Sequence, residues 1–108
     1  MGQLERDFQP KVIKELKKRF PGSIVTKLDA NYIQGIPDLL ILYKDRWATL
    51  ETKKDMAAKK RPNQDYYVKK MNNMSFSAFI HPDNMEEVLS ELQRSFEADR
   101  PACVPKSK

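Results

Sequence analysis

Several residue types are scarce in this chain of 108 residues, and each scarcity excludes a class of site or of protein. The single cysteine, Cys103, excludes an internal disulfide framework, so we expect a reducing, cytoplasmic environment. The chain also has only one histidine, so a zinc site built from cysteine and histidine is excluded. The longest apolar run, Leu39–Tyr43, is far shorter than the roughly 20 residues of a membrane span. No charged and then apolar leader opens the sequence, so we expect neither secretion nor membrane insertion.

Charged residues make up 32% of the chain and hydrophobic residues 40%, a balance typical of a folded globular protein. At this length we expect one domain over residues 1–97, which can bury roughly two-thirds of the surface of its unfolded chain. Pro101 and Pro105 follow the last predicted helix, so residues 98–108 are expected to form a flexible tail.

Positive charge is unevenly distributed along the chain. Lysine and arginine number 20 against 15 acidic residues, which gives a net charge of +5. Residues 1–81 hold 16 basic and 9 acidic residues, whereas residues 82–108 hold 4 and 6. A basic body of this kind favours a polyanionic partner, most often nucleic acid, although an ordinary lysine-rich surface has the same composition.

The spacing of apolar residues predicts three helices. The first runs from Leu4 to Phe20, either kinked at Pro10 or beginning near Gln9 with Pro10 as its first residue. The second begins at Pro62, and the third follows Pro82. The predicted inward faces of these last two helices are Tyr66, Tyr67, Met71 and Met74, and Met85, Val88, Leu89, Leu92 and Phe96.

Four short segments predict strands, at residues 23–28, 39–43, 47–53 and 75–80. The resulting order is helix, three strands, helix, strand, helix. This order predicts an α/β fold in which helices cover the faces of a small sheet.

A tight turn at residues 44–45 would place two acids opposite each other. With two turn residues, Asp38 lies directly across the strand pair from Glu51, and Lys53 shares the face of Glu51. Opposed residues have Cβ atoms ~4.5–5.5 Å apart, so the two carboxylates repel unless a cation lies between them. Oxygen ligands of this kind suit Mg²⁺ or Mn²⁺. A three-residue turn would instead place Glu51 diagonally to Asp38.

Three short motifs resemble a known family of enzymes. Gly35-Ile36-Pro37-Asp38 and Glu51-Thr52-Lys53 resemble the signature of the PD-(D/E)XK nucleases, and Pro62-Asn63-Gln64 narrows the resemblance to the VRR-NUC family. The resemblance extends from Leu4 to Leu92 and lacks only a literal Val-Arg-Arg tripeptide. It implies a restriction-endonuclease-like αβββαβα core with a mixed four-stranded sheet, and a metal-dependent phosphodiesterase. Stand-alone members of the family occur in phages and bacteria.

The resemblance also implies roles for individual residues. Asp38 and Glu51 would hold Mg²⁺, or Mn²⁺, together with the main-chain carbonyl of Thr52. Lys53 would position the attacking water, and Gln64 would support the site. An acid on the first helix would reach the metal, and the best match is Glu5, with Glu15 as the alternative.

Each of these residues also has a purely structural interpretation. Asp38 follows a proline and is a common turn former, and Glu51 and Lys53 would make an ordinary exposed ion pair on a strand. Gln64 would be a first-turn helix residue, and Glu5 a solvated acid near a helix N-terminus. His81, before Pro82, is assigned no role.

Basic residues outside the motifs are candidates for phosphate contacts. They are Lys11, Lys14, Lys18, Lys54, Lys59, Lys60, Arg61, Lys69 and Lys70. No helix carries side chains spaced to read base edges, so we expect DNA to be recognised by its structure rather than its sequence. Small relatives resemble homodimeric resolvases of four-way (Holliday) junctions, which implies a homodimeric endonuclease selective for branched DNA.

Three other interpretations stay open at this point. The chain could be the nuclease subunit of a replication or repair complex, with its acidic last helix as the docking face. It could also be a non-catalytic nucleic-acid-binding module on the same fold. Finally, it could be a protein unrelated to nucleic acid that carries the motif by chance.

Overall fold

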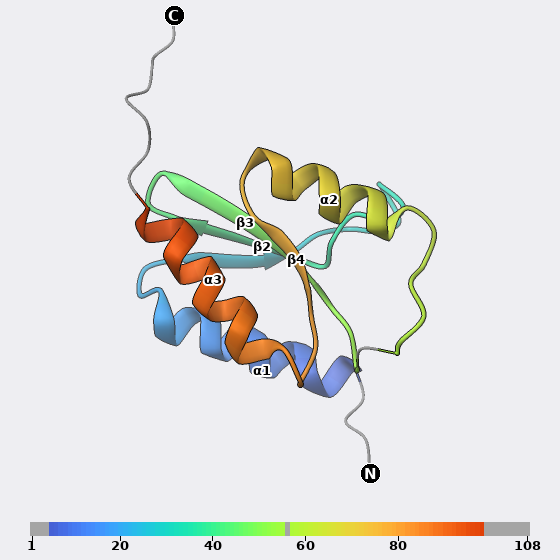
Figure 1. The fold of residues 1–108 in the computed structure, drawn as a ribbon, viewed down its shortest axis with the longest axis horizontal. Helices are drawn as coiled ribbons and strands as arrows, with labels where there is room; N and C mark the ends of the chain where they lie inside the picture. Colours follow the sequence, from blue (N-terminus) through green and yellow to red (C-terminus); the bar gives the residue numbers. More distant parts are fainter. Residues whose placement is uncertain (1–4, 56, 99–108) are drawn as a thin grey trace, which may run out of the picture.

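The structure is a computed structural model, and it describes residues 5–55 and 57–98. Its elements are α1 (Glu5–Arg19), β1 (Ile24–Lys27), β2 (Leu39–Tyr43), β3 (Arg46–Thr52), α2 (Gln64–Met74), β4 (Ser77–Ile80) and α3 (Met85–Glu97). The predicted order of helices and strands is confirmed (Figure 1). No helix in the described ranges is long and apolar enough to cross a membrane.

The four strands form one mixed sheet in the order β1-β2-β3-β4, as the resemblance implied. The pairs β1–β2 and β2–β3 are antiparallel, whereas β3 and β4 are parallel. A parallel pair needs a crossover connection, and α2 supplies it between β3 and β4. Because β3 and β4 run in the same direction, the segments that follow both strands lie at one end of the sheet.

The hairpin between β2 and β3 has the two-residue turn on which the predicted register depends. Tyr43 pairs with Arg46 and Leu39 with Leu50, and Lys44 in the turn adopts a left-handed conformation with φ 58°. Positive φ at the start of a two-residue turn matches the twist of the flanking strands. Continued by one position beyond the last pair, this register places Asp38 across from Glu51.

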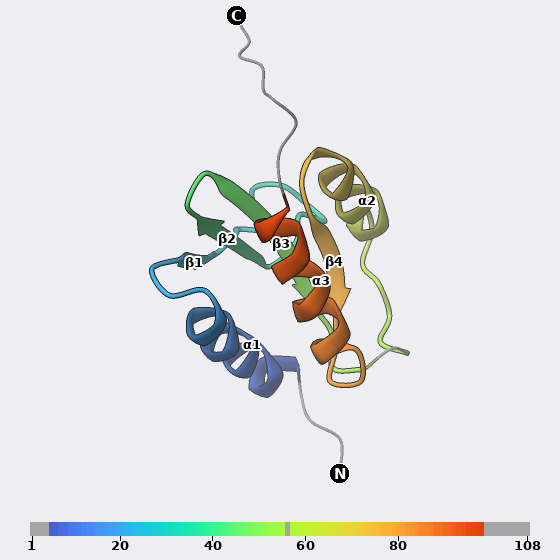
Figure 2. The ribbon, with the colours of Figure 1, turned by 60° about the vertical axis from the view of Figure 1, so that its left-hand side comes forward.

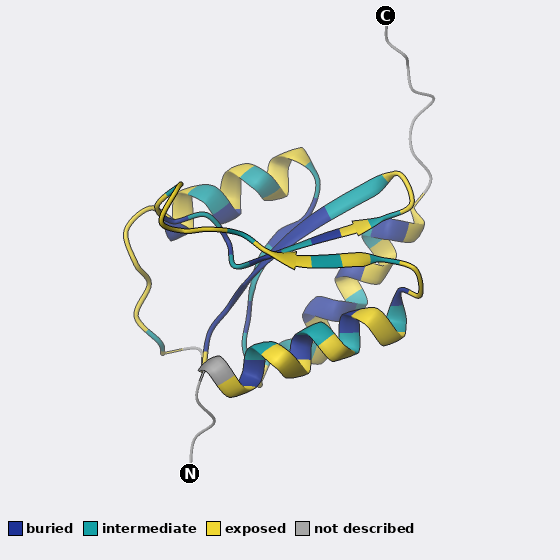
Figure 3. Ribbon diagram, turned by 180° about the vertical axis from the view of Figure 1, so that it is seen from behind, coloured by how far each residue is buried: buried dark blue, intermediate teal, exposed yellow. Residues whose placement is uncertain are grey.

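Helices cover the two faces of the sheet unequally. α1 and α3 pack on one face, and α2 packs over β3 and β4 on the other, as Figures 1 and 2 show from two directions. The main core lies between the sheet and the α1–α3 layer, and buried positions follow the middle strands (Figure 3). Its buried residues are Phe8, Val12, Leu16, Phe20, Leu39, Ile41, Ala48, Leu50, Phe76, Ile80, Val88, Leu89, Leu92 and Phe96.

The first helix is continuous from Glu5 to Arg19 and contains Pro10, so the alternative start near Gln9 is wrong. A proline inside a helix removes one main-chain hydrogen bond, and its ring crowds the carbonyl four residues earlier. Phe8 and Val12 lie on either side of Pro10, and both are buried in the core. Packing of this apolar stripe therefore holds the helix together across the proline.

The predicted inward face of α2 is wrong in part. Met74 and Tyr66 are exposed, so neither belongs to a core, while Gln64 and Val68 are buried and Met71 is half-buried. Positions 64, 68 and 71 follow the helical spacing of one face. The prediction relied on apolar residues, but the face that meets the sheet begins with a buried polar side chain.

Candidate active site

Two ionisable side chains of β3 and its C-terminal end are buried. Glu51 is 1% exposed and Lys53 is 5% exposed, and Lys53 Nζ lies 3.8 Å from Glu51 Oε2. Glutamate and lysine are almost never buried unless they are paired. The interpretation of this pair as an ordinary exposed ion pair on a strand is therefore wrong.

Gln64, the first residue of α2, links the two charges. Its Oε1 accepts a hydrogen bond from Lys53 Nζ at 2.7 Å, and its Nε2 donates to Glu51 Oε2 at 2.7 Å. The main-chain N–H of Arg61 also donates to Gln64 Oε1 at 2.8 Å. An amide oxygen that faces a cation and an amide nitrogen that faces a carboxylate fix the side chain in one orientation. Gln64 therefore contacts both Lys53 and Glu51, and its supporting role in catalysis stays a prediction.

Asp38 is held by the residue that follows Glu51. Its Oδ2 accepts hydrogen bonds from both the main-chain N–H of Thr52, at 2.9 Å, and the Thr52 hydroxyl, at 2.6 Å. Its main-chain carbonyl accepts from the N–H of Leu28 at 2.8 Å, which fixes the chain just before β2. Asp38 and Gln64 also line one hollow. The structure thus brings Asp38, Glu51, Thr52, Lys53 and Gln64 together at one end of the sheet.

The first helix reaches this site through Gln9, which sequence reasoning did not single out. Gln9 Nε2 donates to the hydroxyl of Thr52 at 3.3 Å, and Thr52 is fully buried. The only sequence signal is a polar residue next to the apolar stripe of α1, at Phe8 and Val12. Such a position is common on any helix and carries no functional information by itself.

The structure describes the side chain of only one of the two candidate acids of the first helix. Glu15 accepts a hydrogen bond from Arg19 at 3.0 Å, and Arg19 also donates to Glu86 of α3 at 2.6 Å. Glu15 is thus engaged in the link between α1 and α3. Glu5 begins α1, one turn before Gln9, but its side chain lies outside the described residues. Its predicted role as a metal ligand stays a prediction.

Gly35 explains why the motif that ends in Asp38 begins with glycine. Its φ is +92°, and a Cβ at this position would lie 2.5 Å from the Cβ of Asn63 and 2.8 Å from the carbonyl oxygen of Pro62. Only glycine avoids both the backbone strain and this collision. The loop before β2 therefore packs directly against the start of α2. This contact sets the position of Asp38 relative to Gln64.

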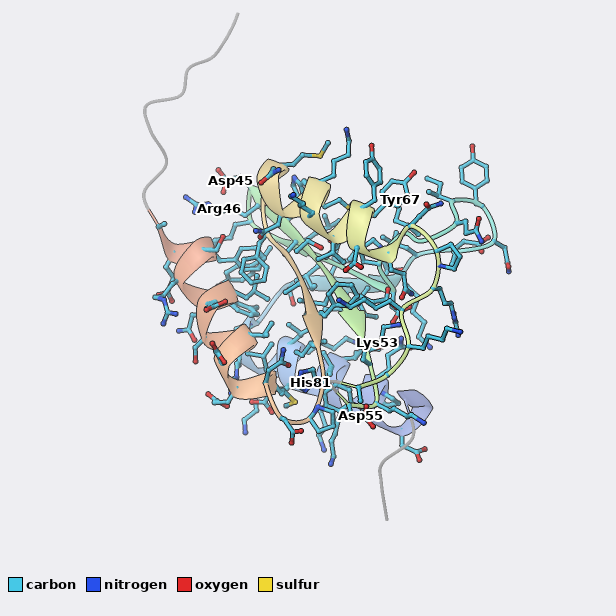
Figure 4. All side chains as sticks on the ribbon, turned by 45° about the vertical axis from the view of Figure 1, so that its right-hand side comes forward. Asp45, Arg46, Lys53, Asp55, Tyr67 and His81 are labelled. Carbon is cyan, nitrogen blue, oxygen red and sulfur yellow. The ribbon has the colours of Figure 1, made fainter. Side chains whose placement is uncertain are left out.

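Lys53 lines a second hollow, with a volume of about 160 Å³. Asp55, Lys60 and His81 also line it, and Figure 4 shows Lys53, Asp55 and His81 next to one another. His81 follows β4 as Lys53 follows β3. Its Nδ1 accepts a hydrogen bond from the N–H of Asp83 at 3.2 Å, which favours the proton on Nε2.

The nine basic residues predicted to contact DNA are all exposed. They lie on α1 (Lys11, Lys14, Lys18), in the segment after β3 (Lys54, Lys59, Lys60, Arg61) and on α2 (Lys69, Lys70). Lys60 is also paired with Asp65 at 3.0 Å and lies 4.5 Å above the ring centroid of Phe79. The segment after β3 adjoins the site, because Arg61 lines the hollow of Asp38 and Gln64.

Oxygen donors at the site suit a hard divalent cation. Asp38 and Glu51 supply carboxylates, and the carbonyl of Thr52 is a third oxygen. Among the described residues, no group of three or more His, Cys, Asp or Glu side chains could hold a metal ion. Mg²⁺ is commonly bound by one or two carboxylates, with waters and substrate phosphates as further ligands, so the residues present fit it.

Comparison with known proteins addresses the fold. No family model matches the sequence, and no curated protein matches it. A solved structure described as "VRR_NUC domain protein" matches with a TM-score of 0.63 and 17% sequence identity, over 90% of this chain and 91% of that chain. A match at this low sequence identity shows a shared fold and nothing further. The chain therefore has the fold of a VRR-NUC domain, consistent with the restriction-endonuclease-like core that its motifs led us to expect.

Proposed function

We propose that this chain is a divalent-metal-dependent nuclease that hydrolyses DNA phosphodiester bonds and is selective for branched DNA. The observation that carries the proposal is the burial of Glu51 and Lys53 around Gln64, next to Asp38. A buried ion pair rarely stabilises a protein more than apolar packing would. Buried, closely coupled ionisable groups are instead typical of functional sites.

Asp38, Glu51 and the carbonyl of Thr52 would hold the cation. When bound, Mg²⁺ polarises a phosphate oxygen and lowers the pKa of a coordinated water. The hydrogen bonds from Thr52 both fall on Oδ2 of Asp38, so that carboxylate is held in one orientation. The Gln64 amide does the same for Glu51. These contacts fix the ligand directions before any cation arrives, which reduces the cost of reorganisation.

Lys53 would place its ammonium group beside the phosphate that is cut. Its Nζ donates to Gln64 Oε1 at 2.7 Å and to the carbonyl oxygen of Lys59 at 3.3 Å. Lysine loses much rotamer freedom when it is fixed, and here the folded protein has already fixed it. A positioned cation stabilises negative charge that develops on the phosphate and can orient the attacking water.

DNA is the expected substrate on two grounds. The structural neighbour is described as a VRR_NUC domain protein, and exposed basic residues lie on α1, on α2 and in the segment after β3 that adjoins the site. Phosphate contacts of this kind give binding that weakens steeply with salt and does not depend on sequence. Selectivity would then come from the shape of branched DNA.

A homodimer would place two sites on the two strands of a junction. Ile24 and Leu42 pair across β1 and β2, and both are exposed on the sheet face that α2 leaves uncovered within the described residues. This exposed apolar pair is the candidate contact with a second copy. Analytical ultracentrifugation of the wild type and Leu42→Glu tests this, because the wild type should sediment as a dimer and the variant as a monomer. A monomeric wild type contradicts the dimer.

Cleavage of labelled four-way junction, flap and duplex DNA tests the proposal. The wild type should cut the junction with Mg²⁺ and not with EDTA, Glu51→Gln should be inactive, and the exposed control Glu91→Gln should cut normally. Activity of the purified chain would also count against a subunit that needs a larger complex. Binding without cleavage would favour a non-catalytic module. A wild type that neither binds nor cuts DNA contradicts the proposal.

A further inference from the structure

The loop between β1 and β2 holds an aromatic side chain out into solvent. Tyr32 is 85% exposed, more than any other large hydrophobic side chain of the described residues. The loop lies beside the start of α2, as Figures 1 and 3 show from opposite sides. Loops that a rigid scaffold positions next to a site commonly carry its binding residues.

The backbone of this loop is held in place around Tyr32. The carbonyl of Asp29 accepts hydrogen bonds from the N–H groups of Tyr32, at 3.1 Å, and Ile33, at 3.3 Å. The carboxylate of Asp29 accepts another from the N–H of Asn31 at 2.8 Å. At its far end the loop is fixed by the close contact between Gly35 and Asn63. An aromatic ring on a fixed backbone loses little conformational freedom when it binds.

The same loop forms one wall of the hollow at the candidate site. Asn31 and Gln34, on either side of Tyr32 in the chain, line the hollow that Asp38 and Gln64 also line, with a volume of about 220 Å³. Tyr32 lies between them in the chain and points into solvent, without lining the hollow itself. A strand whose phosphate is bound in the hollow would have to pass this loop.

We propose that Tyr32 stacks on an unpaired nucleobase of the strand that enters the site. In a continuous duplex each base is stacked on its neighbours, so only an unpaired or splayed base can offer a face to the tyrosine. The preferred substrate is then DNA with an unpaired nucleotide next to the cut, as at a flap or an open branch point. This inference rests on the proposed nuclease function and adds the substrate feature that the site recognises.

A second exposed tyrosine provides a matched control. Tyr66 on α2 is 56% exposed, but its ring lies 5.0 Å from that of Tyr67, and Lys70 Nζ lies 5.7 Å from its centroid. Tyr66 lines a different surface hollow, with Lys69, Lys70 and Asn73. A general effect of removing a surface aromatic would appear at both positions, whereas base stacking at the site would appear at Tyr32 alone.

Fluorescence of 2-aminopurine in metal-free buffer provides a binding test that needs no cleavage. The base is placed at the first unpaired position of a flap, or at the matching position of a duplex. The wild type should quench its fluorescence in the flap, and Tyr32→Ala should abolish the quenching and weaken flap binding about tenfold. Tyr32→Phe and Tyr66→Ala should behave as the wild type, and duplex affinity should be the same in every variant. Equal flap binding by Tyr32→Ala and the wild type would overturn the inference.

Cleavage of the same DNA with Mg²⁺ separates this inference from the proposed function. Tyr32→Ala should still cut, with its preference for the flap over the duplex reduced about tenfold. Cutting by this variant with an unchanged preference would overturn the role of Tyr32 alone. A wild type that cuts none of the substrates would overturn the nuclease function, whatever the fluorescence result.

Discussion

Thr52 binds Asp38 twice, through its main-chain N–H at 2.9 Å and through its hydroxyl at 2.6 Å, and both hydrogen bonds end on Oδ2. The same hydroxyl accepts a hydrogen bond from Gln9 of α1. The middle residue of the Glu51-Thr52-Lys53 motif thus connects the first helix to the carboxylate that immediately precedes β2. Its side chain has a positioning role that its place in the motif does not reveal.

Replacing Thr52 with valine keeps the shape of the side chain and removes the hydroxyl. We expect a loss of about 1–3 kcal/mol in the free energy of unfolding, because buried polar partners are left without their hydrogen bonds. The Mg²⁺ concentration for half-maximal cleavage should also rise, since Asp38 is less firmly oriented. Thr52→Ser should restore both quantities. A Thr52→Val protein with the Mg²⁺ dependence of the wild type would contradict the positioning role.

Replacing Gln64 with glutamate exchanges a donor for an acceptor without a change in size. The carboxylate would face Glu51 where the amide N–H now donates, so like charges would meet in a buried site. We expect a loss of about 2 kcal/mol or more at neutral pH, measured by urea unfolding. Gln93→Glu, on the exposed face of α3, is the control and should cost much less. Equal losses in the two variants would argue against the role assigned to Gln64.

Gly35→Ala and Gly22→Ala form a matched pair. Both glycines have positive φ, +92° and +87°, so alanine meets similar backbone strain of about 1–2 kcal/mol at each. At Gly22 nothing lies within 4 Å of the added Cβ, whereas at Gly35 the Cβ of Asn63 lies 2.5 Å away. Gly35→Ala should therefore lower Tm further and reduce cleavage, and Gly22→Ala should leave cleavage intact. The same effect on cleavage from both substitutions would show that the packing of the Gly35 loop does not determine the position of Asp38.

The link between Arg19 and Glu86 should make stability depend on pH. The hydrogen bond from Arg19 lowers the pKa of the Glu86 carboxyl, and the same contact raises the pKa of Arg19. A lowered pKa in the folded state means that the contribution is present above the unfolded pKa and is lost as the pH falls through the folded pKa. Glu86→Gln should lower Tm at neutral pH and have a smaller effect in acid. Glu87→Gln, at an exposed position in the same turn, should show no such difference; if it does, the assignment to the Arg19 contact is wrong.

Turn length and register were accessible from the sequence, because a two-residue turn fixes the pairing of both strands. The pairing of Tyr43 with Arg46 confirms the prediction and leads to the position of Asp38 opposite Glu51. The fold could also be predicted, because the order of its helices and strands follows from the spacing of apolar residues and from turn residues.

Features that depend on tertiary packing could not be predicted. Pro10 indicated two possible starts for the first helix, and the structure begins it at Glu5, with Phe8 packed in the core before the proline. The inward face of α2 depends on Gln64, a polar residue that apolar spacing cannot identify. Gln9 and Tyr32 belong to no motif. The contact of Gln9 with Thr52, and the place of the Tyr32 loop beside the site, depend on segments that are far apart in the sequence.

As proposed, Asp38 and Glu51 share a divalent cation that is needed to cut DNA. Cleavage of a labelled four-way junction over a series of Mg²⁺ concentrations, by the wild type and by Asp38→Asn, tests it most directly. We predict saturable, Mg²⁺-dependent cleavage by the wild type, and a loss of more than about 100-fold in Asp38→Asn with DNA binding retained. Full Mg²⁺-dependent cleavage by Asp38→Asn would contradict the claim.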